Sequence, residues 1–235
     1  MEFNWFDHLT AFILLIVLPL LSIRSEAFKA DSLDQLPPKK HFYYTNGLML
    51  IIGALLVLTS WNIAHRSWIK LGFQSPTIHM NLLPFIILVA AIYLSDLIYS
   101  FINKDYKTNK IKELANVIPM HWSEYKHYIF LAFAAGISEE IVFRGFLINY
   151  LLTLLSDTLY ATILSIIIPA IVFSLSHLYQ GWWAVLKIML IAGLFGWIFI
   201  QSGSLLIIIV VHILIDLISG LTGVLSDSED TNYTE

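Results

Sequence analysis

One apolar stretch, residues 128–155, limits what this chain can fold into more than any other feature. It is long enough to cross a bilayer, which takes roughly 20 apolar residues, yet it contains Glu139, Glu140 and Arg144. A charged side chain at the centre of a membrane helix costs about 2.5–3.5 kcal/mol on insertion scales, so such groups face a bundle interior and mark candidate functional sites. The stretch therefore predicts a membrane protein whose helices enclose a polar site.

Composition places the whole chain in the same class. Of its 235 residues, 58% are hydrophobic and 13% are charged, and there is no cysteine, so a metal site would need His and carboxylate ligands. We expect an all-α fold, a polytopic membrane helix bundle of about seven transmembrane helices. The predicted spans are 9–23, 44–61, 82–102, 128–155, 159–178, 183–200 and 205–221.

The spans form a single predicted integral-membrane domain, residues 1–225, whose motif core covers about residues 128–221. The remaining segment, 226–235, is acidic and polar, and we expect it to be a disordered cytoplasmic tail. No soluble domain fits between the spans, and the sequence contains no internal repeat.

Lysine and arginine concentrate in the loops that follow the first and third predicted spans. The positive-inside rule assigns such loops to the cytoplasm. The opposite side has only Arg66 and Lys70 in its loops. The charges therefore predict a multi-pass protein of the cell membrane with the N-terminus outside and the C-terminus in the cytoplasm. The cytoplasmic cations are Arg24, Lys29, Lys39, Lys40, Lys104, Lys107, Lys110, Lys112 and Lys126.

Two later spans carry polar residues spaced one helical turn apart. Phe173 and His177 share a face of the span 159–178, and His212 and Asp216 share a face of the last span. Taken singly, a membrane histidine is more often a helix–helix hydrogen bond than a catalyst. Because these groups occur together with the three charges of the central stretch, we expect them to face one another across the bundle interior.

The residues Glu139-Glu140-x-x-x-Arg144, Phe173-x-x-x-His177 and His212-x-x-x-Asp216 resemble, in this order, the three motifs of the CPBP family. This family comprises the CAAX proteases and bacteriocin-processing enzymes, also called Abi, and includes the type II prenyl-protein endopeptidases. The resemblance covers residues 136–216. It implies a membrane bundle, often of eight helices, and an intramembrane endopeptidase that cuts a hydrophobic or lipidated substrate near the cytoplasmic face. Such a substrate would be a CAAX-type protein or a peptide precursor.

The resemblance also implies a role for each catalytic residue. Glu139 would be the general base, and His177 would help to position the attacking water. His212, steadied by Asp216, would stabilise the tetrahedral oxyanion. The supporting residues would be Glu140, Arg144 and Phe173, with the first two paired to brace the helix.

The cofactor stays open at the level of sequence. Glu139, His177 and His212 would also form a ligand set for a divalent metal such as Zn²⁺, because two histidines and one carboxylate leave an open position for water. The HExxH pattern is absent. A metalloprotease and a metal-independent glutamate mechanism therefore both remain.

Two other functions compete with the endopeptidase. One is a non-catalytic membrane protein of bacteriocin self-immunity, which the same resemblance covers. The other is a proton-coupled transporter, but the sequence lacks the inverted repeat and paired broken helices typical of that class. The expected partners are a hydrophobic or lipidated peptide and membrane lipid, and no nucleic acid.

Overall fold

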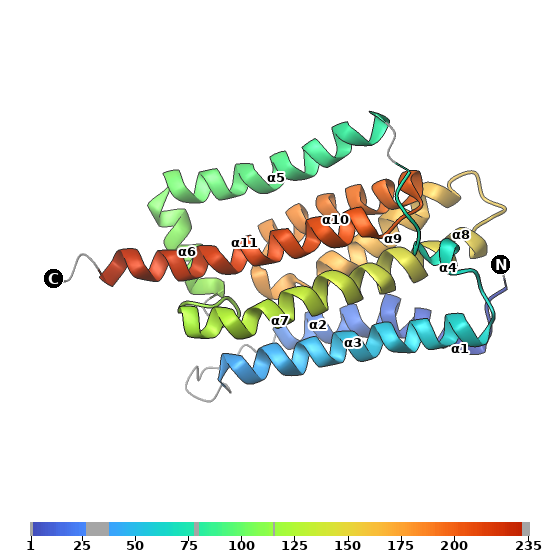
Figure 1. Cartoon of the computed structure of the whole chain (residues 1–235), viewed down its shortest axis with the longest axis horizontal. Coiled ribbons are helices and arrows are strands. Elements are labelled where there is room, and N and C mark those ends of the chain that lie inside the picture. The colour runs from blue at the N-terminus through green and yellow to red at the C-terminus, as the bar shows by residue number, and fades with distance from the viewer. Residues whose placement is uncertain (1, 27–37, 78–79, 115, 232–235) are drawn as a thin grey trace.

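The computed structural model describes residues 2–26, 38–77, 80–114 and 116–231, and within these residues every regular element is a helix (Figure 1). The expected all-α bundle is therefore confirmed. Its elements are α1 (Trp5–Phe12), η1 (Ile13–Val17), α2 (Leu18–Glu26), α3 (Lys39–Ile63), α4 (Trp68–Leu71), η3 (Met80–Leu82), α5 (Leu83–Ile102), α6 (Lys104–Leu114), α7 (Trp122–Glu139), η4 (Glu140–Ile148), α8 (Asn149–Leu154), α9 (Ala161–Leu175), η5 (Leu178–Gln180), α10 (Trp182–Ser202) and α11 (Leu206–Thr231).

Several of these helices have the length and composition of membrane spans. Among the described residues, four stretches qualify on both counts: α3, Met80–Ile102, α10 and Leu206–Ser226 of α11. The apolar helices Trp5–Leu21 and α9 are shorter. The consecutive segments α7, η4 and α8 form one continuous helix, which contains Glu139, Glu140 and Arg144. The two chain ends lie at opposite ends of the bundle (Figure 1), as an odd number of crossings requires.

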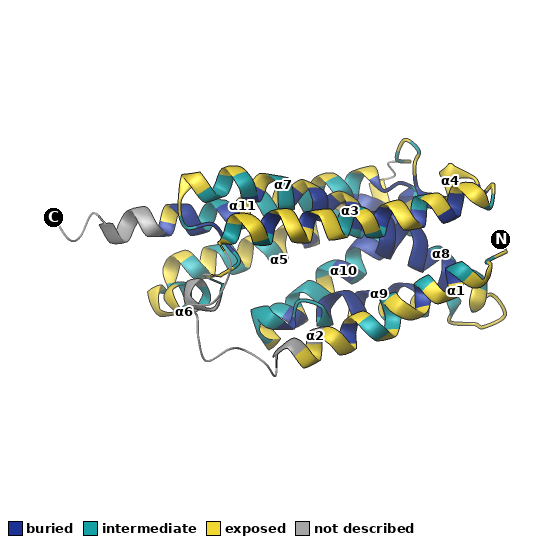
Figure 2. Ribbon diagram, turned by 90° about the horizontal axis from the view of Figure 1, so that it is seen from below, coloured by how far each residue is buried: buried dark blue, intermediate teal, exposed yellow. Residues whose placement is uncertain are grey.

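The helices form two layers that meet at one end. In one layer α7 packs against α3 and α11, and in the other α9 packs against α10 and α2. The π-helical segment η4 follows α7 directly and contacts α3, α9 and α10, so it joins the layers. Figure 2 shows the ribbons of the two layers close together near α8 and farther apart towards α2 and α6. Every residue of η4 is buried, and most of its apolar residues belong to the main hydrophobic cluster, so the segment that carries Glu140 and Arg144 lies inside the bundle.

The last helix extends farther than the sequence indicated. α11 continues to Thr231 and so covers residues 226–231, which we expected to be disordered. Ser226 Oγ donates a hydrogen bond to the carbonyl of Thr222 at 2.7 Å, so this polar side chain is satisfied within the helix. Residues 232–235 of the predicted tail lie outside the described residues.

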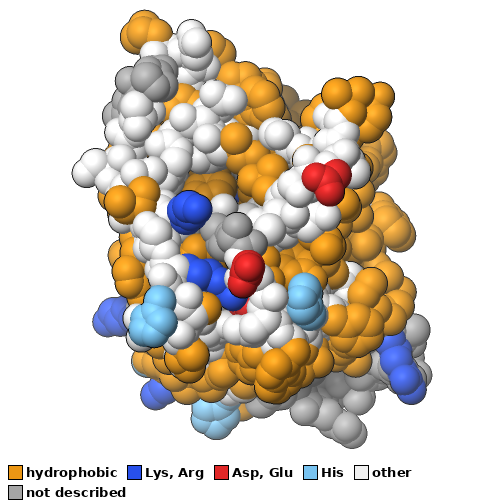
Figure 3. Space-filling model, turned by 90° about the vertical axis from the view of Figure 1, so that its right-hand side faces the viewer, with side chains coloured by type: hydrophobic (Ala, Val, Ile, Leu, Met, Phe, Trp, Pro, Cys, Tyr) orange, Lys and Arg blue, Asp and Glu red, His pale blue; other side chains and the backbone are white. Residues whose placement is uncertain are grey.

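A buried ion pair at the α4 end of the bundle was not anticipated. Both terminal nitrogens of Arg66 donate to the carboxylate of Asp7, to which Ser60 Oγ also donates at 2.7 Å. The guanidinium lies 4.6 Å from the centre of the Phe3 ring. The pair explains why Arg66 occurs on the side of the bundle that has few positive charges: the Asp7 carboxylate neutralises the arginine inside the protein. Figure 3 shows this end of the molecule, where hydrophobic side chains surround a few scattered charged groups.

Candidate active site

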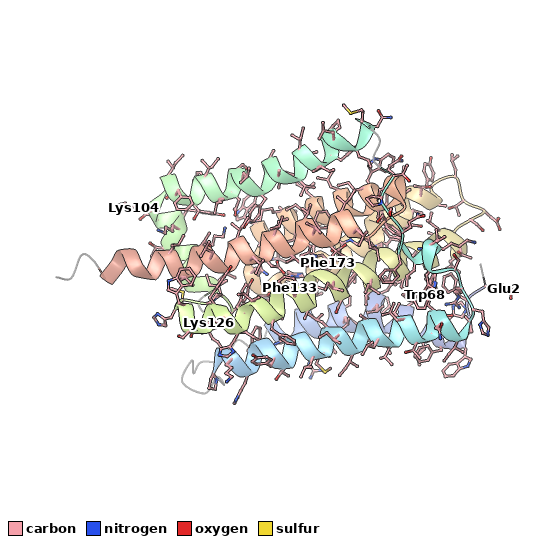
Figure 4. The ribbon with its side chains drawn as sticks, in the orientation of Figure 1. Glu2, Trp68, Lys104, Lys126, Phe133 and Phe173 are labelled. Carbon is pink, nitrogen blue, oxygen red and sulfur yellow. The ribbon has the colours of Figure 1, made fainter. Side chains whose placement is uncertain are left out.

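The motif residues come together where η4, α9 and α11 meet. The π-helical segment η4 begins at Glu140, directly after Glu139, and wider turns of this kind often occur at functional sites. Phe173 is in the last turn of α9 and His177 lies in the turn that follows it. Figure 4 shows Phe173 midway along the bundle, between Lys104 and Lys126 at one end and Trp68 at the other. The three motifs therefore meet inside the bundle, as expected.

Glu140 is the centre of the polar cluster. It is fully buried, and its Oε1 accepts a hydrogen bond from Arg144 Nη1 at 2.8 Å, so the predicted ion pair is present. The same oxygen lies 2.6 Å from His212 Nδ1. Because an ionised carboxylate only accepts hydrogen bonds, Nδ1 carries the proton in this contact. Glu140 thus braces the helix through Arg144 and also fixes the ring of His212.

His212 presents its other nitrogen to two further carboxylates. Nε2 lies 3.6 Å from Glu139 Oε2 and 3.7 Å from Asp216 Oδ2, beyond direct hydrogen-bond distance in both cases. We expected Asp216 to steady His212, but the short contact comes from Glu140. The reason is geometric: Asp216 is one turn farther along the same helix and reaches the far nitrogen, whereas η4 approaches Nδ1 from the neighbouring helix.

His177 is fixed by the end of its own helix. Its Nδ1 lies 2.9 Å from the carbonyl oxygen of Phe173 and 3.2 Å from Ser176 Oγ. A carbonyl only accepts, so Nδ1 carries the proton and Nε2 is left as an acceptor. The Phe173 ring lies 4.7 Å from the His177 ring and 6.2 Å from the His212 ring, measured between centroids. Phe173 therefore lies next to both histidines.

Two phenylalanines cover the arginine of the first motif. The Arg144 guanidinium lies 4.8 Å from the ring centre of Phe173 and 5.4 Å from that of Phe195. A cation over an aromatic face is stabilised by the quadrupole of the ring. Arg144 is 3% exposed, so these rings and Glu140 replace its hydration. Phe195 was missed from sequence because α10 carries no motif.

Three tyrosine hydroxyls hold the part of α11 that carries Asp216. They donate to three consecutive backbone carbonyls, those of residues 215–217. Tyr125 and Tyr128 reach from α7 and Tyr93 from α5. The i, i+3 spacing of the two α7 tyrosines is a sequence signal that could have indicated this contact. The donor–acceptor distances are 3.2 Å for Tyr93 and Ile215, 3.3 Å for Tyr128 and Asp216, and 3.0 Å for Tyr125 and Leu217.

The predicted metal ligands do not form a metal-binding group. In the part of the chain that the structure describes, no three His, Asp or Glu side chains are arranged to hold a metal ion. The Nδ1 atoms of His177 and His212 face the Phe173 carbonyl and Glu140, so Nε2 is the nitrogen that each ring has left for a ligand. His and carboxylate are ligand types that Zn²⁺ uses, but within the described residues these side chains do not form a metal-binding group.

The approach of α7 to α11 makes the Glu140–His212 contact possible. A Cβ on Gly136 would lie 2.5 Å from Ile213 Cγ1 and 3.1 Å from Ile213 N, next to His212. We expect Gly136→Ala to push the two helices apart and to lower the free energy of unfolding by about 1–3 kcal/mol. Denaturant unfolding in detergent measures this. Gly53→Ala is the matched control, because nothing lies within 4 Å of its added Cβ. Equal stability of the two variants would contradict the prediction.

A comparison of the sequence with protein-family models finds a match over the segment that contains the three motifs. Residues 121–218 match the family model described as type II CAAX prenyl endopeptidase Rce1-like. No curated protein and no solved structure gives a significant match. The matched segment contains every residue of the three motifs. Residues 121–218, which hold the candidate site, are therefore similar to the Rce1-like type II CAAX prenyl endopeptidases, and this match supports an assignment to the CAAX protease family.

Proposed function

We propose that the protein is an intramembrane endopeptidase that hydrolyses a peptide bond of a hydrophobic or lipidated substrate, with Glu139 as the general base. The observation that carries this proposal is the position of Glu139. Its Oε2 lies 3.6 Å from His212 Nε2, and the other nitrogen of that ring is fixed by Glu140 at 2.6 Å. A carboxylate beside a pre-oriented imidazole supplies the base and the electrophile that amide hydrolysis needs.

The first step is the attack of water on the peptide carbonyl. Glu139 takes a proton from the water, and His177 Nε2, left as an acceptor, orients it. The oxygen of water forms a bond to the carbonyl carbon while the carbonyl π pair moves onto its oxygen. Protonated His212 then donates from Nε2 to this oxyanion, and Asp216 supports the imidazolium charge.

The second step is the departure of the amine. Glu139 returns the proton that it took from the water to the nitrogen of the scissile bond. The oxyanion re-forms the carbonyl, and the bond from carbon to nitrogen breaks. The products are a carboxylic acid and an amine, so one water is consumed and no redox partner is needed. Glu140 and Arg144 stay paired throughout and hold His212.

The orientation of the chain determines where the substrate is cut. The lysine-rich ends of α3, α6 and α7 lie at the end of the bundle opposite to the N-terminus (Figure 4). The positive-inside rule makes this end cytoplasmic, which puts the N-terminus outside in the cell membrane. A lipidated or apolar peptide would then enter from the bilayer or its cytoplasmic face, and the partners are this peptide and membrane lipid.

Cleavage by the purified protein tests the proposal. We expect the protein in detergent or in liposomes to cut a hydrophobic peptide, and mass spectrometry of the products identifies the bond. Matched pairs of CAAX-type peptides with and without a prenyl group would show whether the lipid is required. Binding of these peptides without any product would contradict the endopeptidase and favour a non-catalytic immunity role.

The same assay decides whether a metal is required. We expect activity to persist after chelation, because Glu139, His177 and His212 are not arranged as a metal-ligand group. Elemental analysis of the assayed sample must show that no stoichiometric metal remains. Loss of activity on chelation, followed by recovery with Zn²⁺, would contradict this prediction and assign these residues as ligands.

A further inference from the structure

The turn that follows His177 places two polar side chains beside the site that no motif includes. The ring of Tyr179 stacks on the His177 ring, with centroids 6.1 Å apart and planes 28° apart. Gln180 Nε2 donates a hydrogen bond to the Tyr179 hydroxyl oxygen at 3.0 Å. Tyr179 is thus tied to a catalytic histidine on one side and to its own neighbour on the other.

The backbone fixes the position of this tyrosine. The amide of Gln180 donates to the carbonyl of His177, and that of Gly181 donates to the carbonyl of Leu178, both at 2.9 Å. Gly181 has φ +87°, a conformation that side chains other than glycine rarely adopt. Helix α2 also packs against the turn. Tyr179 therefore belongs to a defined turn and not to a free loop.

The hydrogen-bond inventory of Tyr179 shows what its hydroxyl can do. A phenol has one proton to donate and accepts through its oxygen. Gln180 occupies the accepting side, which leaves the proton for another acceptor. The hydrogen bond from Gln180 also holds the outer end of the ring that stacks on His177. By contrast, the nearby Tyr128 already donates to the backbone carbonyl of Asp216.

We propose that Tyr179 is a positioning residue of the active site: its ring, held at the hydroxyl by Gln180, fixes the tilt of the His177 ring. The proposal rests on the endopeptidase function. It assigns a residue that keeps the water-orienting histidine in place. The reaction steps themselves are unchanged, because Tyr179 neither gains nor loses a proton overall.

Kinetics of Tyr179→Phe test the role of the hydroxyl. This variant keeps the ring and removes the hydroxyl that Gln180 holds, so we expect kcat to fall about 3- to 10-fold with KM nearly unchanged. Gln180→Ala should lower kcat to a similar extent, because it removes the same hydrogen bond. Tyr160→Phe is the matched control, since Tyr160 is exposed at the far end of α9, and its kcat should equal that of the parent protein.

A second readout does not require activity. The histidines can be labelled and titrated by NMR, and their neighbours are the charged groups Glu139, Glu140, Arg144 and Asp216. In Tyr179→Phe we expect the midpoint of His177 or His212 to move by about 0.5–1 pH unit, because removing one hydrogen bond changes the field at the site. A role in folding alone would change the unfolding midpoint and leave the histidine midpoints in place.

The outcomes separate this proposal from the proposed function. If the parent protein cuts peptides and Tyr179→Phe has the same kcat and the same histidine midpoints, the role of Tyr179 is overturned and the endopeptidase stands. If the parent cuts nothing but the midpoints move, the endopeptidase is overturned and the coupling of Tyr179 to the site stands. If the parent cuts nothing and the midpoints do not move, both are overturned.

Discussion

Glu139→Gln is expected to abolish peptide hydrolysis while leaving the fold intact. Glutamine has the size and shape of glutamate, but it cannot take a proton from water. General-base catalysis contributes about 10²–10⁴-fold, so the residual rate should fall below the background of most peptide assays. Glu139 makes no contact with His212 shorter than 3.6 Å, so the substitution breaks no short hydrogen bond between them. Product formation and thermal unfolding, measured on the same preparation, test both parts.

Glu2→Gln is the control for this experiment. Glu2 lies at the far end of the molecule (Figure 4), and its substitution removes the same charge without touching the site. The control should retain full activity. A protein that keeps both its cellular phenotype and its substrate binding after Glu139→Gln would oppose the endopeptidase and support an immunity role.

Arg144→Ala is expected to cause the largest loss of stability of any single substitution at the site. It would leave the fully buried Glu140 carboxylate without its 2.8 Å partner, and its Oε2 already has no hydrogen bond within the described residues. Breaking a buried ion pair by removing one partner costs about 3–5 kcal/mol. Denaturant unfolding in detergent and the yield of membrane-inserted protein should both show the loss.

A double variant tests the cause of that loss. In Glu140→Gln with Arg144→Ala, no buried charge is left unpaired, so the pair should be less destabilised than the sum of the two single variants. Arg144→Lys should lie between the parent and Arg144→Ala, because it keeps the charge but loses the planar guanidinium over Phe173. A stable, abundant but inactive Arg144→Ala protein would instead indicate that this arginine acts directly in catalysis.

Sequence reasoning was most successful for contacts that lie along one helix. The Glu140–Arg144 pair follows from i, i+4 spacing, and the positions of the helices follow from apolar run length. The convergence of the three motifs follows from the cost of burying polar groups in lipid. Each of these inferences needs only the residue spacing in the sequence together with the helical repeat or the thickness of a bilayer.

Contacts between helices were not predictable in the same way. The contact of Glu140 with His212 joins residues that are distant in sequence, and it depends on how closely α7 and α11 approach. The buried Asp7–Arg66 pair is of the same kind. Asp96 is another case, since its Oδ2 accepts from Lys187 of α10 at 2.8 Å. Such pairs depend on which helices become neighbours, and apolar run length does not specify that.

The position of His212 on α11 has a consequence for biosynthesis. Membrane helices form independently and then associate, and a growing chain supplies them from the N-terminus onwards. When α7, η4 and α9 are already in the membrane, Glu139 and His177 are present, but Glu140 still lacks its contact with His212. On the proposed mechanism, the newly made chain therefore lacks a complete catalytic set during most of its insertion, and peptidase activity would begin only when α11 enters the membrane and packs against α7.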